Sequence, residues 1–231
     1  MTGWRTIGVI GGMGPAATVA FLGALVTAAR SEWAAAHDSG HPRVLVDSNP
    51  NVPDRNAALA GGASPGPVLA DMAARLMAQG AEVLAMPCNA AHGWADAVRA
   101  VAGECFVDIV DTAVAAAMAH RPLRIGVIAI GATLDARLYD RAPVPVIAAD
   151  RDRVQALVNR IKAGDTGDDV RAAMTAVAAN LVAGGAEVII AACSEVPLVL
   201  GGTPVPFIDA TAALASATLA AARLCDRSPT T

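Results

Sequence analysis

The chain has 231 residues, of which 55% are hydrophobic, 3% aromatic and 16% charged, and its net charge at pH 7 is -4. An apolar chain without blocks of like charge has the composition of a folded protein, and this length suits one large domain or two lobes of roughly 100 residues each. A mildly acidic chain with few aromatic residues is a poor candidate for nonspecific binding to nucleic acid or membranes, and its apolar runs are shorter than the roughly 18 residues of a spanning helix.

Short runs rich in valine and isoleucine alternate with longer alanine-rich stretches. The short runs are apolar at successive positions, which is typical of strands covered on both faces. In chain order, the predicted strands are Thr6–Ile10, Val44–Asp47, Val83–Met86, Phe106–Ile109, Ile125–Ile130, Val144–Ala148, Val188–Ala192 and Val205–Ile208. The predicted helices between them are Ala16–Arg30, Pro67–Gln79, His92–Val101, Asp111–Ala119, Asp150–Lys162, Asp168–Ala183 and Asp209–Leu224. This alternation predicts an α/β fold, with parallel strands and helices on both faces.

Two segments of the chain are repeated in the same order. Residues 5–11 (RTIGVIG) return as 123–129 (LRIGVIA), and residues 80–89 (GAEVLAMPCN) return as 185–194 (GAEVIIAACS). A single pair of similar segments can arise by chance between two buried strands, but two pairs in the same order indicate two similar halves. In both copies of the second segment, Ala-Glu leads into an apolar strand and a cysteine follows at the strand's carboxyl end.

The repeats predict two pseudo-symmetric lobes, each a mainly parallel sheet flanked by helices, with the active site in the cleft between them. We place the first lobe at residues 1–112 and the second at 113–208. The C-terminal helix, within 209–231, is expected to pack back on the first lobe.

The two matched cysteines are Cys88 and Cys193, at strand ends where ligands of open α/β sheets bind. An apparent helix start follows each, so we expect the helix dipole and free amides to lower the pKa of each thiol. Two sulfurs facing one ligand suit removal of a proton from one face of a carbon and its return to the other. The alternative is that both are small buried apolar residues, as free cysteines often are. Their equivalent placement favours the first interpretation, whereas Cys105 and Cys225 lack such a context.

The N-terminal segment lacks a signal-peptide pattern, because the first predicted strand runs directly into a glycine-rich turn. We therefore expect a cytoplasmic protein whose four cysteines are reduced and form no disulfides. No Cys-x-x-Cys spacing occurs, and the four histidines have no paired spacing with a carboxylate. The sequence therefore suggests no metal site.

Five segments resemble, in the same order, the aspartate/glutamate racemases, which are cofactor-independent amino-acid racemases of two pseudo-symmetric lobes. The segments are 7–18 (IGVIGGMGPAAT), 47–55 (DSNPNVPDR), 87–92 (PCNAAH), 161–164 (IKAG) and 192–198 (ACSEVPL). The chain is most similar to the aspartate racemase branch. Glutamate racemases usually carry an Asp-Ser-Gly opening and a histidine after the second Cys-Thr, where this chain has Gly12-Met13-Gly14 and Glu195.

The resemblance implies that Cys88 and Cys193 are the two catalytic bases, and that Arg55 and Lys162 bind the substrate carboxylates. This agrees with their chemistry, because arginine binds a carboxylate through two parallel hydrogen bonds and lysine adds a point charge. The alternative for each cation is ordinary surface charge. The resemblance also implies a homodimer without cofactor or metal, acting on an amino acid, with aspartate the first choice and glutamate or another amino acid as alternatives. The other implied substrate-binding residues are Met13, Asn56, Asn89, Ala90, Ala91 and Ser194.

Three positions differ from the family pattern. Ala90 replaces a threonine, Asn56 stands where threonine is common, and Ser194 replaces a threonine but keeps the hydroxyl. Losing one hydrogen bond to a charged group costs roughly 1.5–3 kcal/mol. Because Ala90 lacks this hydroxyl, the sequence does not identify the substrate. The sequence does not decide whether His92 and Glu195 take part.

Two other functions fit parts of the sequence. Residues 12–17 (GMGPAA) match the Gly-x-Gly-x-x-Ala turn of dinucleotide-binding proteins, but no acidic residue ends a second strand about 20 residues later. A non-catalytic protein that binds dicarboxylates or amino acids would share the lobes and the two cations. It would not need a pair of thiols.

Overall fold

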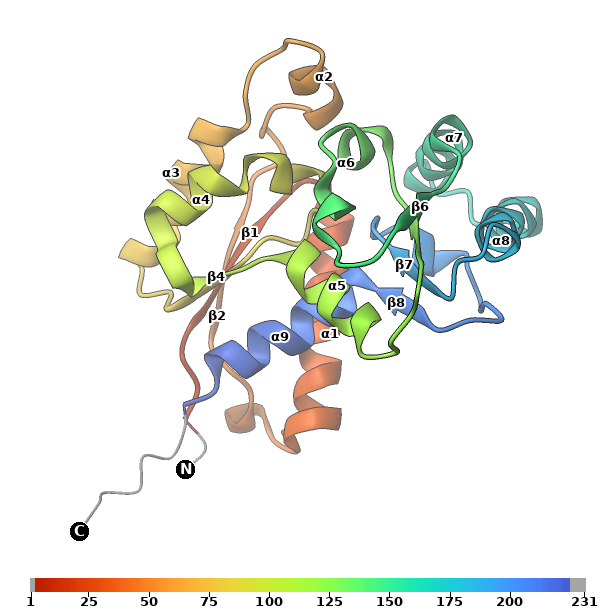
Figure 1. The fold of residues 1–231 in the computed structure, drawn as a ribbon. Helices are drawn as coiled ribbons and strands as arrows, with labels where there is room; N and C mark the ends of the chain where they lie inside the picture. Colours follow the sequence, from red (N-terminus) through yellow and green to blue (C-terminus); the bar gives the residue numbers. More distant parts are fainter. Residues whose placement is uncertain (1–2, 225–231) are drawn as a thin grey trace.

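The computed structural model describes residues 3–224 and contains two four-stranded sheets in which every pair of neighbouring strands is parallel. The first sheet has the order β2-β1-β3-β4 and the second the order β6-β5-β7-β8, so the same topology occurs twice (Figure 1). The strands are β1 (Ile7–Gly11), β2 (Val44–Ser48), β3 (Val83–Ala85), β4 (Phe106–Val107), β5 (Ile125–Ile128), β6 (Val146–Ala148), β7 (Val188–Ala191) and β8 (Phe207–Asp209). The predicted α/β fold with two parallel sheets is confirmed.

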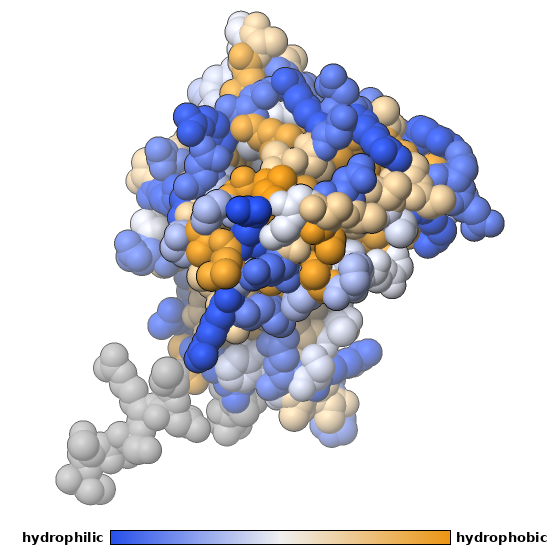
Figure 2. All heavy atoms as spheres, turned by 45° about the vertical axis from the view of Figure 1, so that its right-hand side comes forward, coloured by the Kyte–Doolittle hydropathy of each residue, from blue (hydrophilic) through white to orange (hydrophobic). Residues whose placement is uncertain are grey.

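Nine α-helices lie within the described residues. They are α1 (Pro15–Trp33), α2 (Arg55–Leu59), α3 (Gly66–Ala78), α4 (Ala95–Ala102), α5 (Ile109–Met118), α6 (Gly131–Asp135), α7 (Arg151–Lys162), α8 (Asp168–Ala183) and α9 (Ala210–Ala222). Helices α3 and α4 lie against one side of the first sheet, and α7 and α8 against one side of the second (Figure 1). No helix among residues 3–224 is long and apolar enough to cross a membrane. On the face seen in Figure 2, charged and polar side chains interrupt the hydrophobic patches.

The largest hydrophobic core is shared by the two sheets. It contains buried residues of β1 and β5 together with residues of α1, α5 and α9, which lie between the sheets (Figure 1). Helix α9 packs on α1 and α5 and also contacts β3, β4 and β8. Helix α5 crosses the predicted lobe boundary at residue 112, and that division of the chain stays a prediction. Residues 225–231, the end of the C-terminal segment 209–231 that is expected to pack on the first lobe, lie outside the described residues.

Equivalent glycines allow the segments that follow α3 and α8 to pack closely on the central strands. A Cβ atom on Gly8 of β1 would lie 2.8 Å from the Cβ atom of Ala81, and one on Gly126 of β5 would lie 3.0 Å from that of Ala186. These four residues occupy matching positions in the two sequence repeats. The repeat therefore extends from the sequence to the packing.

The structure corrects several predicted element ends. Strand β4 ends at Val107 instead of Ile109, because the Asp108 carboxylate accepts hydrogen bonds from the amides of Val110 and Asp111 and starts helix α5. Helix α9 ends at Ala222, two residues before the predicted end.

Two short helices were not predicted. Asp54 caps α2 by accepting a hydrogen bond from the amide of Ala57, at 2.9 Å. Helix α6 begins at Gly131, and the strand before it ends at Ile128 instead of Ile130. Both helices are five residues long, too short for a helical periodicity to be recognised in the sequence.

Candidate active site

The carboxyl ends of β3 and β7 meet at one small cavity between the two halves of the molecule. Cys88 follows β3 and Cys193 follows β7, and both line this cavity. Six of the other predicted substrate-binding residues also line it: Met13, Arg55, Asn89, Ala90, Lys162 and Ser194. The structure therefore brings together residues that are far apart in the sequence.

Two predicted residues do not line the cavity. Asn56 is exposed on α2, because the residue after Arg55 in a helix points about 100° away from it. The side chain of Ala91 is buried elsewhere, but its backbone amide interacts with the Cys88 thiol. Cys105 is half-buried outside the cavity, and Cys225 lies outside the described residues.

The Cys88 thiol is held against the glycine-rich turn that follows β1. It donates a hydrogen bond to the backbone carbonyl of Met13, with an Sγ–O distance of 3.2 Å. Burial raises the pKa of Cys88, and the positive charges of Arg55 and Lys162 and the Ala91 amide only partly offset this. The lowered pKa predicted from the helix dipole is therefore wrong, because desolvation of the thiolate outweighs nearby dipoles and cations.

The Cys193 thiol faces a carboxylate. It donates a hydrogen bond to Oε2 of Glu195 at 3.0 Å, and the Ser194 hydroxyl donates to the same oxygen at 2.9 Å. Burial and the negative charge of Glu195 raise the pKa of Cys193 well above its ordinary value. Here too the predicted lowering is wrong. The two cysteines therefore have different surroundings: Cys193 is held as a thiol, whereas Cys88 faces two cations.

The two predicted carboxylate-binding cations lie at the edge of the cavity. Arg55 is the first residue of α2, and its guanidinium donates to the carbonyls of Met13 and Pro53, each at 3.3 Å. Among residues 3–224, no carboxylate lies within 4.0 Å of this guanidinium. Lys162 ends α7, and its Nζ lies 4.0 Å from Oε1 of Glu195. Arg55 can therefore accept an anion without giving up an ion pair.

A wider cavity adjoins the inner cavity that both cysteines line. The inner cavity has a volume of about 30 Å³, enough for about two water molecules. The outer cavity has about 620 Å³ and shares Met13, Arg55, Lys162 and Glu195 with the inner one. A bound amino acid would therefore have to widen the inner cavity, and the two cations would flank its entrance.

Sequence reasoning missed two threonines that line the inner cavity, Thr133 and Thr211. The Thr133 hydroxyl is buried and has no hydrogen-bond partner within the described part of the chain. Thr211 is the second residue of α9, which follows β8 directly. The internal repeat could have found Thr133, because the turn after β5 corresponds to the turn after β1 that carries Met13.

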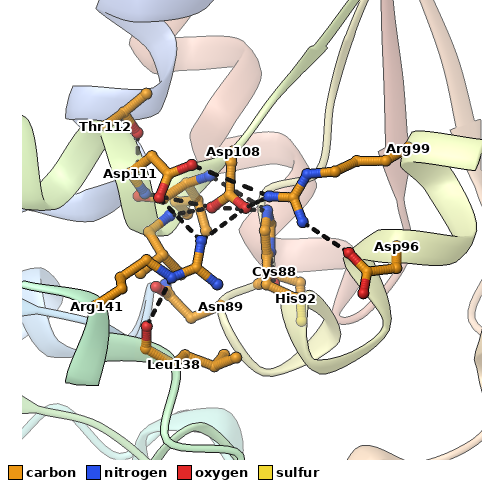
Figure 3. Close-up of polar contacts among 12 residues, drawn as sticks. Cys88, Asn89, His92, Asp96, Arg99, Asp108, Asp111, Thr112, Leu138 and Arg141 are labelled. Atoms are coloured by element: carbon orange, nitrogen blue, oxygen red, sulfur yellow. Dashed lines mark hydrogen bonds and ion pairs between the residues drawn. The ribbon is translucent and has the colours of Figure 1, made fainter. Parts of the chain in front are cut away.

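His92 contacts the backbone of Cys88 and does not line the inner cavity (Figure 3). Its Nε2 accepts a hydrogen bond from the amide of Ile109 at 3.2 Å, and its Nδ1 lies 2.9 Å from the carbonyl of Cys88. Nδ1 therefore carries the proton and donates to that carbonyl. Burial lowers the pKa of His92, which keeps the ring neutral. Its contacts are structural.

Behind His92, the buried carboxylate of Asp108 joins two arginines (Figure 3). Asp108 pairs with Arg99 and lies 3.3 Å from Nη1 of Arg141, while it also caps α5. Its Oδ1 lies 3.8 Å from Nε2 of His92. These contacts tie α4, α5 and the segment 138–141 together. Within residues 3–224 there is no group of three or more His, Cys, Asp or Glu residues that could hold a metal ion.

The sequence matches a family model described as Asp/Glu/hydantoin racemase over residues 10–218. This chain belongs to that racemase family. The match spans both sheets and includes both cysteines of the cavity. The family resemblance inferred from the five sequence motifs is thereby confirmed.

Several known proteins are similar to this racemase family member over almost its whole length. The broad specificity amino-acid racemase RacX of Bacillus subtilis is 23% identical in an alignment of 221 residues, which covers 92% of this chain and 96% of RacX. The solved structure of Picrophilus torridus aspartate racemase has a TM-score of 0.82 at 25% identity, and 95% of each chain is covered. Francisella tularensis glutamate racemase, solved with D-glutamate, has a TM-score of 0.64 at 16% identity, with 92% and 79% covered, and shows a shared fold.

Proposed function

We propose that this protein interconverts the L- and D-enantiomers of an amino acid through two cysteines, without pyridoxal phosphate or metal. The observation that carries the proposal is that two thiols from equivalent strand ends, Cys88 and Cys193, line one cavity. A racemase of this kind needs one group on each face of the Cα atom. A cavity that served only for binding would not need a thiol from each half.

In the proposed reaction, the Cys88 thiolate removes the Cα proton from one face of the substrate. The electron pair of the broken C–H bond stays on the substrate as a carbanion, and the positive charges of Arg55 and Lys162 offset the developing negative charge. Cys193 then donates its thiol proton to the opposite face, which leaves a Cys88 thiol and a Cys193 thiolate. Proton exchange with solvent restores the starting state, and the reverse reaction exchanges the two roles.

The starting protonation states follow from the surroundings of the two thiols. Glu195 accepts a hydrogen bond from Cys193 and adds to the effect of burial in raising its pKa, so Cys193 starts as the protonated thiol that carries the proton to be donated. Arg55 and Lys162 act in the opposite sense on Cys88, so Cys88 is the more readily ionised of the two. The unpartnered hydroxyl of Thr133 is available to a substrate oxygen or nitrogen.

Aspartate is the first substrate to test, because two cations at the entrance suit a dicarboxylate and an aspartate racemase shares the fold. Ala90 lines the cavity without the hydroxyl expected from the family pattern, and RacX is named for broad specificity. The test panel should therefore also contain glutamate and neutral and basic amino acids. The family resemblance further supports a homodimer, and the four cysteines suit the reducing cytoplasm.

The test is to incubate the protein with each amino acid in D2O and to follow deuterium at Cα and the enantiomer ratio. We expect exchange with at least one substrate, and a loss of at least about 100-fold in both Cys88→Ser and Cys193→Ser. Cys105→Ser is the matched control and should keep wild-type activity. Wild-type activity in either cavity variant would contradict the mechanism.

Two other outcomes separate this proposal from the alternatives. If dicarboxylates raise the melting temperature but no amino acid exchanges its Cα proton, the protein is a binding protein. If NAD or NADP raises the melting temperature, the glycine-rich turn binds a nucleotide. We expect neither outcome.

A further inference from the structure

A tyrosine from the second half of the chain contacts the residue next to Cys88. Tyr139 lies in the short 3-10 helix 138–141. Its hydroxyl donates a hydrogen bond to Oδ1 of Asn89, with an O–O distance of 2.6 Å, and both side chains are buried. Burial raises the pKa of Tyr139 far above its ordinary value, so the phenol stays a donor at every pH of interest.

This hydrogen bond determines how the Asn89 amide is oriented. An asparagine side chain has one oxygen acceptor and one NH2 group with two donors. In the structure the phenol donates to the amide oxygen, so Oδ1 points to Tyr139 and the NH2 group points elsewhere. Asn89 lines the inner cavity, and within residues 3–224 its Nδ2 atom has no hydrogen-bond partner.

The segment that carries Tyr139 is itself fixed to the first half of the chain. Nη1 of Arg141 lies 2.9 Å from Oδ1 of Asp111 and 3.3 Å from Oδ2 of the buried Asp108 (Figure 3). Nε of Arg141 donates to the carbonyl of Leu138 at 3.1 Å, which holds the 3-10 turn closed (Figure 3). The Tyr139 hydroxyl therefore has little freedom to follow Asn89 if the amide rotates.

We propose that Tyr139 is a positioning residue, which orients the amide of Asn89 so that its NH2 group faces the cavity and receives the substrate's carboxylate. The inference rests on the proposed function and names the substrate class as carboxylates. An unrestrained amide would also expose its oxygen to the cavity, and that oxygen would repel a carboxylate. The two cations at the entrance attract an anion from solvent, whereas the oriented amide lies beside Cys88.

The test compares wild type with Tyr139→Phe, Asn89→Ala and the double variant. Succinate serves as a dicarboxylate probe without a reacting amino-acid centre, and its dissociation constant is measured by calorimetry. We expect Tyr139→Phe to weaken succinate binding about five-fold, the worth of one neutral hydrogen bond. In the Asn89→Ala background, Tyr139→Phe should have no further effect, because Tyr139 acts through Asn89.

Thr218→Val is the matched control. Thr218 is fully buried in α9, and its hydroxyl donates to the carbonyl of Leu214 at 2.7 Å, away from the cavity. The substitution also removes one buried hydroxyl, so it reports the effect of lost stability alone. We expect it to leave succinate binding and the KM of Cα exchange unchanged.

Asn89→Asp tests the orientation without altering Tyr139, should Tyr139→Phe fail to fold. One carboxylate oxygen can still accept from the phenol, while the other replaces the NH2 group, so we expect at least ten-fold weaker succinate binding. The inference is overturned if Asn89→Asp binds succinate like wild type, if Tyr139→Phe behaves like Thr218→Val, or if the effects of Tyr139→Phe and Asn89→Ala multiply in the double variant. Absence of Cα exchange in the wild type would instead refute the proposed function, and the succinate measurements would still test Tyr139.

Discussion

Replacing Asp108 by alanine should destabilise the fold far more than replacing its neighbour Asp111. The side chain of Asp108 is 5% exposed, caps α5 and pairs with Arg99 and Arg141, whereas that of Asp111 is 59% exposed. Loss of the cap costs about 1 kcal/mol, and removing one partner of a buried ion pair costs about 3–5 kcal/mol. Both arginines are about one-third exposed and can turn toward water. We therefore expect Asp108→Ala to lower the free energy of unfolding by about 3 kcal/mol, the lower end of the range for a buried ion pair.

The assay is urea unfolding followed by circular dichroism, supported by thermal melts. For a chain of this size, about 3 kcal/mol lowers the melting temperature by about 6–12 °C. Asp111→Ala is the matched control and should cost less than about 1 kcal/mol, because its ion pairs with Arg141 and Arg99 involve an exposed carboxylate. Equal losses in the two variants would refute the argument that the buried carboxylate stabilises the cluster behind Cys88.

The same carboxylate gives the stability a defined dependence on pH. Burial raises the pKa of Asp108, but the hydrogen bonds from two amides and the nearby positive charges outweigh it, and the pKa lies below its ordinary value. The contribution of Asp108 to the free energy of unfolding is therefore complete above the ordinary Asp pKa of about 3.9 and is lost as the pH falls through the lower folded value. We expect wild type and Asp108→Asn to differ at pH 6 and to converge in acid. A difference that grows in acid would contradict this sign.

Three further substitutions test other parts of the structure. Glu195→Gln removes the charge that raises the pKa of Cys193, so alkylation of that cysteine near pH 8, followed by mass spectrometry, should become faster; an unchanged rate would contradict the assigned cause. Gly8→Ala should lower the free energy of unfolding by about 1–3 kcal/mol through overpacking. Gly23→Ala should raise it by about 0.5–1 kcal/mol, because Gly23 lies inside α1 and a Cβ atom there would meet no neighbouring atom. Urea unfolding of both variants measures the two effects. Ala90→Thr should alter the relative rates of Cα exchange across the amino-acid panel, and an unchanged profile would show that the hydroxyl does not affect specificity.

Much of the fold follows from local patterns in the sequence. Each predicted strand corresponds to a strand of the structure, because buried parallel strands are short, apolar and rich in β-branched residues. The repeat also placed Cys88 and Cys193 at equivalent strand ends, and they do share a cavity. Parallel topology places each cysteine at the carboxyl edge of its own sheet, and the packing of the two equivalent sheets brings these two edges together.

What could not be predicted depends on tertiary packing. The helix dipole predicts lowered pKa values for both thiols, whereas burial raises them. The sequence does not reveal how completely each sulfur is removed from water. The contact between Tyr139 and Asn89 joins residues 50 positions apart, and no periodicity encodes it. The end of β4 was misplaced because Asp108, and not Asp111, caps the following helix.

The core shared by the two sheets is relevant to how a chain with two similar halves evolves. A single half, with its one sheet, would expose the apolar face that α1 and α5 now bury against α9 and β7. Two identical half-length chains could cover that face by pairing, and the pair would present two cysteines in identical surroundings. Joining the halves in one chain removes that symmetry constraint. Glu195 can then stand beside one sulfur and Arg55 near the other, which specialises the two thiols for different protonation states.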